Sequence, residues 1–281
     1  MIKKTKTNST KKYLPLLLFS ITIIASIYLG NNWIQITTYN ITSSKLPNDF
    51  HDFKILQISD LHNKKFGKDN NILTNNIKKI KPDIILITGD LIDYKKSDIN
   101  IAIKLISQIK EIAPIYFVNG NHEWWSGKAK KLENKLIEEN VTILNNKIIS
   151  ISRGKSEIVL IGVDDPEGFS SHNEYINKLK ELSNEKFSIL LSHRAEDFAL
   201  YVKNNYDIVF AGHAHGGQIR IPFIGGLVSP NQGFFPEFTS GIHEKGNTRM
   251  IISRGLGNSI IPVRIFNRPE LVVVNIRTDI R

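Results

Sequence analysis

The sequence Val118-Asn119-Gly120-Asn121-His122-Glu123 begins with the last residue of an apolar run, Ile115 to Val118. After the run come Asn119 and Gly120, which are followed by an amide, an imidazole and a carboxylate. The side-chain oxygen of Asn is neutral and binds metal weakly, so it suits a site in which other ligands supply the charge. By itself, the Gly-Asn-His-Glu tetrapeptide also fits a polar turn after a strand.

Four other apolar runs end in the same way, with Asp or His at or just past the last apolar residue. The motifs at these ends are Asp60-x-His62, Gly89-Asp90, His193 and Gly212-His213-x-His215. In an α/β sheet, ligands bind just beyond the carboxyl ends of the strands. We therefore expect the five loops to converge on one site that offers oxygen and imidazole ligands.

Taken in order, these motifs resemble those of the calcineurin-like metallophosphoesterase superfamily. Three segments resemble its membrane-associated branch, which is related to the bacterial YkuE and YaeI phosphoesterases. These segments are Gly212 to Gln218, Ser253 to Gly257 and Ile265 to Pro269. The resemblance covers the chain from Lys45 to the C terminus. It implies a four-layer α/β/β/α sandwich, preceded here by one N-terminal transmembrane helix.

The resemblance also implies two divalent metal ions, Mn, Fe or Zn, that share one carboxylate. The ligands of one ion would be Asp60, His62, Asp90 and His215, and those of the other Asp90, Asn121, His193 and His213. His122 resembles the family's catalytic histidine, which protonates the leaving oxygen or stabilises charge on the phosphoryl group. Asp93 would orient that histidine, although it equally suits capping of the turn that follows.

One departure from the family pattern narrows the substrate class. Relatives that act on phosphoproteins carry an Arg directly after the second Asp, whereas Tyr94 follows Asp93 here. This difference argues against a phosphoprotein phosphatase. Arg194, Arg254 and Arg268 are candidate phosphate or head-group binders, and each equally suits an ion pair or an exposed surface position.

The N-terminal 44 residues separate into a basic and an apolar part. Residues 1–12 carry five lysines, and no charged residue occurs between Lys12 and Lys45. Residues 13–33 form an apolar run that just reaches the length of about 20 residues needed to cross a bilayer. The lysines predict a cytoplasmic tail, a single-pass anchor in the cell membrane and an extracytoplasmic domain. Cleavage of this run as a signal peptide, near Ala25, is the alternative.

The remaining chain alternates between strand and helix patterns. Residues 34–52 are expected to form an entry strand and a linker, and residues 53–281 the metallophosphoesterase domain. The alternation predicts a largely parallel sheet covered by helices, with Ser97 capping the helix that begins at Asp98. Aromatic residues in the Gly- and Pro-rich loop after Pro222 are expected to pack on the core rather than contact substrate.

Composition limits the classes of function. The chain has no cysteine, which excludes disulfides and thiolate metal sites. Removing the five N-terminal lysines from the formal charge of +10 leaves +5, so specific nucleic-acid binding is not expected.

Two main function classes remain. The first is a membrane-anchored phosphoesterase that acts on a phosphorylated small molecule or a lipid-linked substrate, with UDP-2,3-diacylglucosamine hydrolysis suggested by the resemblance. The second is a non-catalytic, membrane-tethered metal-binding module. The full ligand set together with His122 argues against that module, because a binding module has no need of a catalytic histidine. A nuclease or nucleotide phosphodiesterase also fits the same metal centre.

Overall fold

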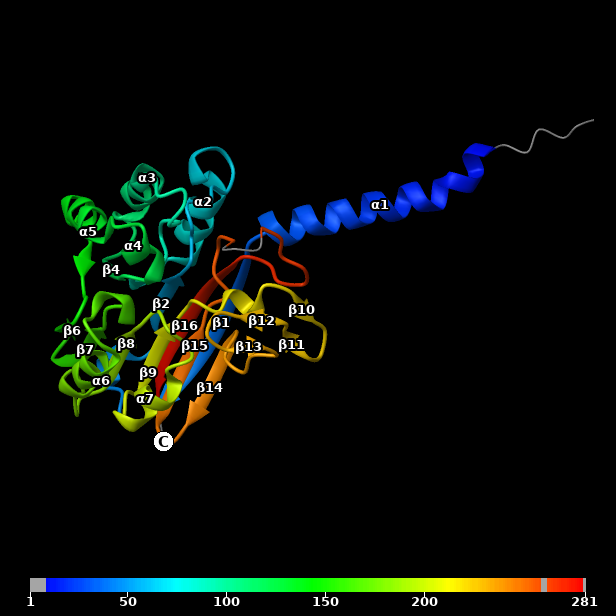
Figure 1. Cartoon of the computed structure of the whole chain (residues 1–281). Helices are drawn as coiled ribbons and strands as arrows, with labels where there is room; N and C mark the ends of the chain where they lie inside the picture. Colours follow the sequence, from blue (N-terminus) through cyan, green and yellow to red (C-terminus); the bar gives the residue numbers. More distant parts are fainter. Residues whose placement is uncertain (1–8, 259–261, 280–281) are drawn as a thin grey trace, which may run out of the picture.

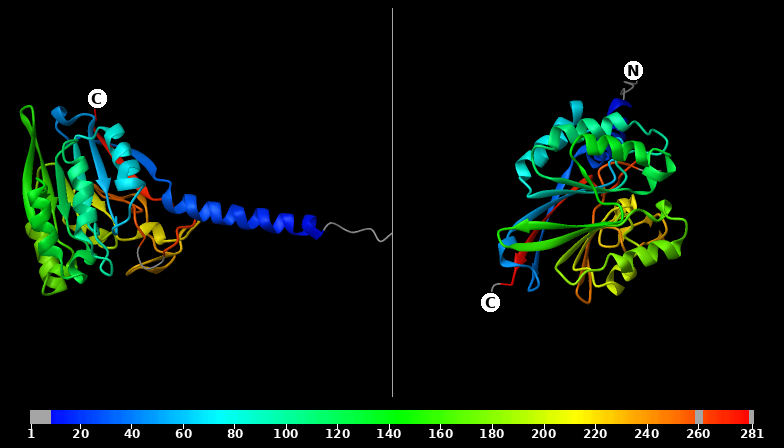
Figure 2. Two further views of the ribbon diagram at one scale, coloured as in Figure 1. Left: turned by 90° about the horizontal axis from the view of Figure 1, so that it is seen from above. Right: turned by 90° about the vertical axis from the view of Figure 1, so that its left-hand side faces the viewer.

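The computed structural model describes residues 9–258 and 262–279. Two six-stranded sheets lie face to face, and helices cover the outer face of each sheet (Figure 1, Figure 2). The α/β/β/α sandwich implied by the sequence is therefore confirmed.

The first sheet has the strand order β1-β16-β2-β3-β4-β5. Its strands are β1 (Gln35–Ser43), β16 (Glu270–Thr278), β2 (Phe53–Ile58), β3 (Ile84–Thr88), β4 (Ile115–Val118) and β5 (Thr142–Ile143). Neighbouring strands are parallel except for β16 and β2. The segment 34–52, predicted to be an entry strand and a linker, thus contributes the edge strand β1, which pairs with β16 along its whole length.

The second sheet has the strand order β14-β15-β9-β8-β7-β6. Its strands are β14 (Gly241–Lys245), β15 (Thr248–Ile252), β9 (Ile208–Ala211), β8 (Ser188–Leu191), β7 (Ser156–Gly162) and β6 (Lys147–Arg153). The outer pairs are antiparallel, whereas β15, β9, β8 and β7 run parallel to one another. The carboxyl ends of the central parallel strands therefore lie along one edge of this sheet.

Helices on the two outer faces complete the layers. The first sheet is covered by α2 (Asn71–Ile80), α3 (Ile99–Ile109) and α5 (Ala129–Glu138), and the second by α6 (His172–Glu181) and α7 (Phe198–Lys203). Single turns occur at η1 (Asn48–Phe50), η2 (Lys68–Asn70), η3 (Pro166–Gly168) and η4 (His215–Gly217). The prediction that Ser97 caps α3 was wrong: the Asp98 side chain accepts the Asn100 N–H, so the helix begins one residue later.

Side-chain alternation explains why the central strands are apolar on both faces. Successive residues of a strand point to opposite sides of the sheet. Ile55 and Leu86 accordingly lie in the core between the sheets, and their neighbours Leu56 and Ile85 lie beneath the helices of the first sheet. Strands buried on both faces appear in a sequence as continuous apolar runs, which is the pattern seen here.

The loop after η4 forms two small hairpins. They are β10 (Arg220–Ile221) with β11 (Gly225–Gly226) and β12 (Val228–Ser229) with β13 (Gly233–Phe234). The prediction that its aromatic residues pack on the core is correct for Phe238, whose ring lies 5.5 Å from that of Phe198. It is wrong for Phe223, Phe234 and Phe235, which are exposed.

The N-terminal helix α1 (Ser9–Asn32) projects away from the sandwich (Figure 1). From Tyr13 to Asn32 it is long and apolar enough to cross a membrane, and most of its described side chains are exposed. The predicted N-terminal apolar helix is therefore present as a candidate membrane span. Residues 1–8 of the predicted basic tail lie outside the described residues.

Candidate metal centre

Seven predicted ligands meet at the carboxyl ends of strands from both sheets. Asp60 and His62 follow β2, Asp90 follows β3, Asn121 follows β4, His193 follows β8, and His213 and His215 follow β9. All seven are buried, with exposed fractions of 7% or less. The two sheets therefore position these polar side chains in one place, out of contact with bulk water.

The backbone at this edge is unusual. Five of the seven residues have φ between 47° and 66°: Asp60, His62, Asp90, His213 and His215. Such left-handed conformations are uncommon for non-glycine residues, and they concentrate at functional sites whose surroundings enforce them. Each of these residues lies in a turn that follows its strand.

Glycines allow these loops to approach one another. A Cβ atom on Gly120 would collide with the carboxylate of Asp90, and one on Gly212 would collide with Ser59 and with the carboxylate of Asp60. Any larger residue would displace a predicted ligand. This close approach explains why glycine precedes Asn121 and His213 in the sequence.

Two groups of side-chain atoms offer lone pairs to a metal ion, and we call these atoms donors. The first group of donors surrounds His62. Its Nε2 lies 3.0 Å from His215 Nε2 and 3.5 Å from Asp90 Oδ2. Asp60 Oδ1 lies 3.3 Å from His215 Nε2. Two imidazole nitrogens and two carboxylates thus point toward a common centre.

The second group surrounds His193. Its Nε2 lies 3.3 Å from Asp90 Oδ2, 3.1 Å from Asn121 Oδ1 and 3.2 Å from His213 Nδ1. His193 Nδ1 lies 2.7 Å from the Thr88 carbonyl oxygen, which can only accept, so Nδ1 carries a proton. The lone pair of Nε2 in the neutral ring is consequently directed at the other donors.

Asp90 belongs to both groups. Its Oδ2 is the carboxylate oxygen that faces His62 and His193, and its Oδ1 accepts the His122 N–H at 2.9 Å. Burial alone would raise the pKa of Asp90, but the neighbouring His193 holds it well below its usual value. Burial likewise opposes the charged form of His193, yet Asp90 raises the pKa of this imidazole to about 10. A positive charge is therefore strongly favoured beside Asp90, carried by a second proton on His193 Nε2 where no metal ion is bound and by the metal ion where one replaces that proton.

The outer nitrogen of His62 supports the fit to metal ions. His62 Nδ1 is buried without a hydrogen-bond partner among the described residues, and Asp93 Oδ2 lies 3.8 Å away. Metal-binding imidazoles commonly direct their second nitrogen toward a carboxylate. His213 differs, because its Nε2 lies 3.0 Å from Arg194 Nη1 and 3.6 Å from Glu196 Oε1. Together with the oxygen and imidazole donors, this arrangement fits divalent cations.

His122 lies beside the two groups with a defined proton position. Its Nδ1 accepts the Tyr94 N–H at 3.2 Å, so the proton of the neutral ring is on Nε2, 3.9 Å from Asp90 Oδ2. Burial lowers the pKa of His122, against the opposing effect of Asp90 and Asp93, which keeps the ring neutral near pH 7. The neutral ring can therefore donate a hydrogen bond from Nε2.

Asp93 caps a turn and lies beside the His122 ring, whose Nδ1 already accepts the Tyr94 N–H. Its Oδ2 lies 3.6 Å from His122 Nδ1. Its Oδ1 accepts the N–H groups of Lys95 and Lys96 at 2.9 and 3.0 Å, which caps the turn. The turn thus holds the carboxylate close to the His122 ring.

A model of the calcineurin-like phosphoesterase family matches residues 53–217. The chain belongs to this family. It is therefore a metal-dependent phosphoester hydrolase, and its buried Asp and His cluster is suited to divalent metal ions.

Similar proteins span most of the length of this phosphoesterase. The uncharacterized metallophosphoesterase YkuE of Bacillus subtilis is 29% identical over 257 residues, which cover 89% of this chain and 88% of YkuE. The phosphodiesterase YaeI of Escherichia coli is 26% identical over 265 residues, covering 89% and 90%. A transmembrane protein with metallophosphoesterase domain from Bos taurus is 27% identical over 277 residues, covering 92% and 61%. These similarities match the branch indicated by the sequence.

Two of the three predicted arginines of this phosphoesterase, Arg194 and Arg254, form ion pairs within the domain. Arg194 is buried and makes two hydrogen bonds to Asp165, at 2.7 and 2.8 Å, while its Nη1 lies 3.0 Å from His213 Nε2. Arg254 donates to Glu270 at 2.9 Å. Both guanidinium groups are thus held by carboxylates of the domain.

Glu123 is a residue of the site that sequence reasoning left without a role. Its carboxylate accepts the N–H groups of Asp90 and Gly120 at 2.8 Å and that of Ile92 at 3.1 Å. Burial raises its pKa to about 8, although these three donors favour the ionised form. Glu123 joins the loop after β3 to the loop after β4. Its spacing of three residues from Gly120 resembles that of a helix-capping glutamate, a signal present in the sequence.

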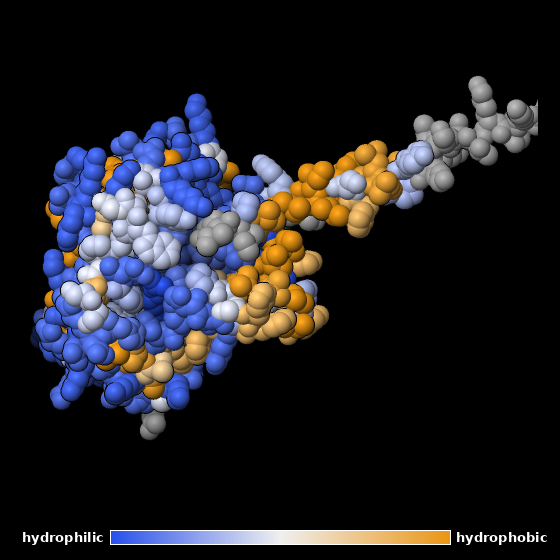
Figure 3. Space-filling model, in the orientation of Figure 1, coloured by the Kyte–Doolittle hydropathy of each residue, from blue (hydrophilic) through white to orange (hydrophobic). Residues whose placement is uncertain are grey.

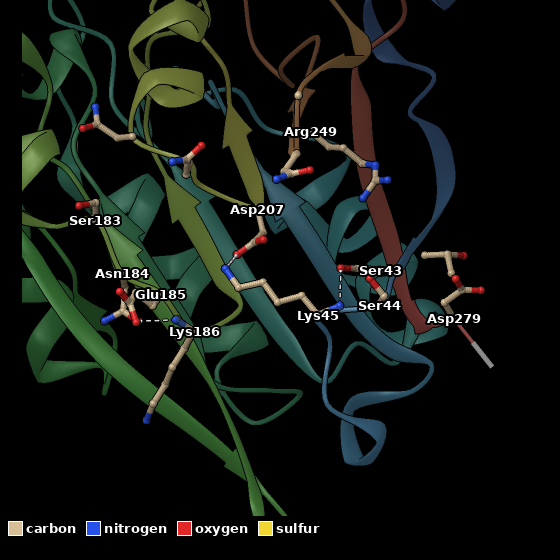
Figure 4. A pocket seen from close by; sticks show the side chains of 15 residues that line it. Ser43, Ser44, Lys45, Ser183, Asn184, Glu185, Lys186, Asp207, Arg249 and Asp279 are labelled. Carbon is tan, nitrogen blue, oxygen red and sulfur yellow. Dashed lines mark hydrogen bonds and ion pairs between the residues drawn. The ribbon is translucent and has the colours of Figure 1, made fainter. Parts of the chain in front are cut away.

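A large polar depression lies at the opposite end of the strands of this phosphoesterase. Its volume is about 1460 Å³, and it is lined by segments next to β1, β8, β9, β15 and β16 (Figure 4). Lys45 Nζ lies 2.7 Å from Asp207 Oδ2 there, and Lys186 and Arg249 pair with Glu157 and Glu244. The cations of this depression are therefore paired, and none of the seven predicted ligands lines it.

Proposed function

We propose that this phosphoesterase uses two metal ions and is anchored in a membrane. The main support for two ions is the position of Asp90 Oδ2. This oxygen lies 3.5 Å from His62 Nε2 in the first group and 3.3 Å from His193 Nε2 in the second. One carboxylate oxygen between two sets of donors supports a bridging role. Oxygen and imidazole ligands suit Mn, Fe or Zn.

In this proposal each ion has the four ligands named from the sequence, and His122 and Asp93 act on the substrate side. Bound divalent ions neutralise charge on the phosphate and lower the pKa of water in the site. The Nε2–H of neutral His122 would stabilise charge on the phosphoryl group through a hydrogen bond. When the ring carries a second proton, which the nearby Asp93 carboxylate favours, His122 would instead pass the Nε2 proton to the leaving oxygen and return to its neutral form. The proposed substrates are phosphate esters or diphosphates of lipid-linked or sugar-nucleotide compounds, such as UDP-2,3-diacylglucosamine.

Metal removal and a substrate panel test the chemistry. Full-length protein in detergent micelles should hydrolyse an aryl phosphate ester, lose this activity after chelation and recover it with added Mn. Elemental analysis should then give two ions per chain. The panel should include a lipid-linked diphosphate, a cyclic nucleotide and single-stranded nucleic acid. Faster hydrolysis of the nucleic acid than of the lipid-linked compound would favour the nuclease alternative. Unchanged turnover in the chelator would contradict the metal mechanism.

The membrane arrangement is a separate part of the proposal. Residues 1–12 would form the cytoplasmic tail, residues 13–33 the anchor, and the domain would lie outside the cytoplasm. The apolar helix and the five lysines before Tyr13 support this orientation. Protease added to intact cells should digest the region after Lys45. Protection of this region until lysis would reverse the topology.

A further inference from the structure

Exposed apolar side chains gather on one part of the surface of the domain. Five large apolar side chains have exposed fractions between 62% and 109%: Phe223, Ile224, Phe234, Phe235 and Phe266. No other large apolar side chain after α1 reaches 60% among the residues whose burial the structure describes. They form a patch over the β10–β13 hairpins, beside the end of α1 (Figure 3). Contiguous apolar patches of this kind mark surfaces that contact protein or membrane.

The two loops of this patch are joined to each other. Arg220 N donates to Ile265 O at 2.9 Å, which links the first hairpin to the segment that carries Phe266. A hollow of about 340 Å³ lies between them, lined by residues 220–225 and Phe266. The loops therefore act as one surface, which we call the apolar rim: Pro222 to Ile224, Phe234, Phe235 and Phe266.

The apolar rim is fixed next to the end of α1. Asn31 Oδ1 accepts a hydrogen bond from Asn258 at 2.8 Å, and the Asn31 carbonyl accepts one from Lys64. Arg268 stacks over the ring of Trp33 at 4.2 Å and donates to the Trp33 carbonyl oxygen. The helix consequently meets the domain at the base of the segment that carries the rim.

We propose that the apolar rim inserts into the lipid bilayer beside α1, as a second membrane contact of this chain. This inference rests on the proposed anchor. A spanning helix ends at the membrane interface, where aromatic side chains are enriched. Because the rim is attached at the end of α1, the surface of the same bilayer lies next to it. Exposed Phe and Ile side chains then leave water for the boundary between head groups and acyl chains.

The same loop reaches the metal centre. It begins directly after His215, and its backbone packs closely on η4 where Gly217 contacts Gly226. Asn231, between the rim residues Ile224 and Phe234, donates to Glu196 at 2.8 Å and lies 3.4 Å from His213 Nε2. Insertion of the rim would hold the donor cluster close to the head-group layer. A phosphate ester with a lipid tail could then enter the site without leaving the membrane.

Site-directed fluorescence on the full chain tests this contact. The chain has no cysteine, so Phe223→Cys and Phe266→Cys each give one labelling site. Ile137→Cys is the matched control, since Ile137 is 56% exposed on α5. Each variant is labelled with a polarity-sensitive dye and reconstituted into phosphatidylcholine and phosphatidylglycerol vesicles. The emission of labels at positions 223 and 266 should shift to the blue, and nitroxide-labelled lipids should quench most of that emission. The label at position 137 should show neither the blue shift nor the quenching.

Three other outcomes overturn the inference, and they are distinguishable. If the protein floats with the vesicles but its rim labels respond as Ile137 does, the anchor stands and the rim contact is wrong. If the protein does not float with the vesicles, the anchor itself fails. A blue shift without quenching by lipid nitroxides would place a protein surface, such as a second copy, over the rim and would contradict the bilayer as its partner.

Discussion

At the carboxyl ends of the central strands, polar side chains converge on two common points, whereas at the amino ends of β8 and β9 they pair with one another. Asp90 Oδ2 faces imidazole nitrogens of both donor groups. Asp207, at the other end, accepts from Lys45 and from the Ser188 N–H at 2.9 Å. In the first arrangement, lone pairs remain available to bind a cation. In the second, the carboxylate lone pairs of Asp207 already accept hydrogen bonds from Lys45 and Ser188.

This difference shows that the size of a surface depression does not identify the position of the candidate metal centre. The depression at the Asp207 end measures about 1460 Å³, yet its cations are paired, and the described residues form no cluster of metal-binding side chains there. The donors at the Asp90 end are buried and closely packed. Buried polar groups must find partners, and the groups at the Asp90 end can be satisfied together by metal ions.

The largest effect is expected at Asp90. Asp90→Asn should reduce activity to background and lower the content of both proposed metals, because the oxygen proposed to bridge them loses its charge. Activity and elemental analysis on the same preparation measure this. A variant that retained full metal occupancy would contradict the bridging role.

His122→Ala should separate catalysis from metal binding. Metal content should remain near that of the wild type, because Asn121 is the proposed ligand, while turnover should fall by about 10²–10⁴-fold if His122 is a general acid. The loss should be smaller for an aryl ester with an acidic phenol than for an alkyl ester, since a good leaving group needs less protonation. Equal losses for both esters would assign His122 to the phosphoryl oxygens instead.

A smaller effect is expected at Glu196, which lies 3.6 Å from His213 Nε2. Glu196→Gln keeps the shape of the side chain and removes its charge. Metal affinity should fall by about 10–100-fold, as for other partners of metal-binding histidines. Metal titration followed by thermal unfolding measures the change. An unchanged affinity would mean that Glu196 serves only to hold Asn231.

The smallest effect on activity is expected at the opposite end of the strands. Asp207→Asn is the matched control for Asp90→Asn, because both replace a buried carboxylate by an amide. It should cost about 1–3 kcal/mol of unfolding free energy through weakened hydrogen bonds, and leave turnover and metal content unchanged. A large loss of turnover in the folded Asp207→Asn variant would contradict the conclusion that only the Asp90 end of the strands carries the active site.

The sequence predicts much of this fold because the signals are local. Each predicted ligand follows an apolar run, and the runs are strands buried on both faces. The position of β1 beside β16 was not predictable in this way, since the pairing joins residues more than 230 positions apart. The same holds for Arg194 with Asp165, whose partners lie on different loops and carry no mutual signal in the chain. Glu123 had a local signal in its spacing from Gly120.

The left-handed backbone at five of the seven predicted ligand positions limits which substitutions the chain can accept there. Asp, Asn and His tolerate positive φ better than other non-glycine residues, and the same three residue types supply oxygen and imidazole donors. A bulky or β-branched replacement at Asp60, Asp90 or His213 would be penalised by the conformation as well as by the missing donor. Exchanges within this small set of residue types are therefore the accessible changes at these positions. Divergence of this chain toward other metals should proceed through such exchanges.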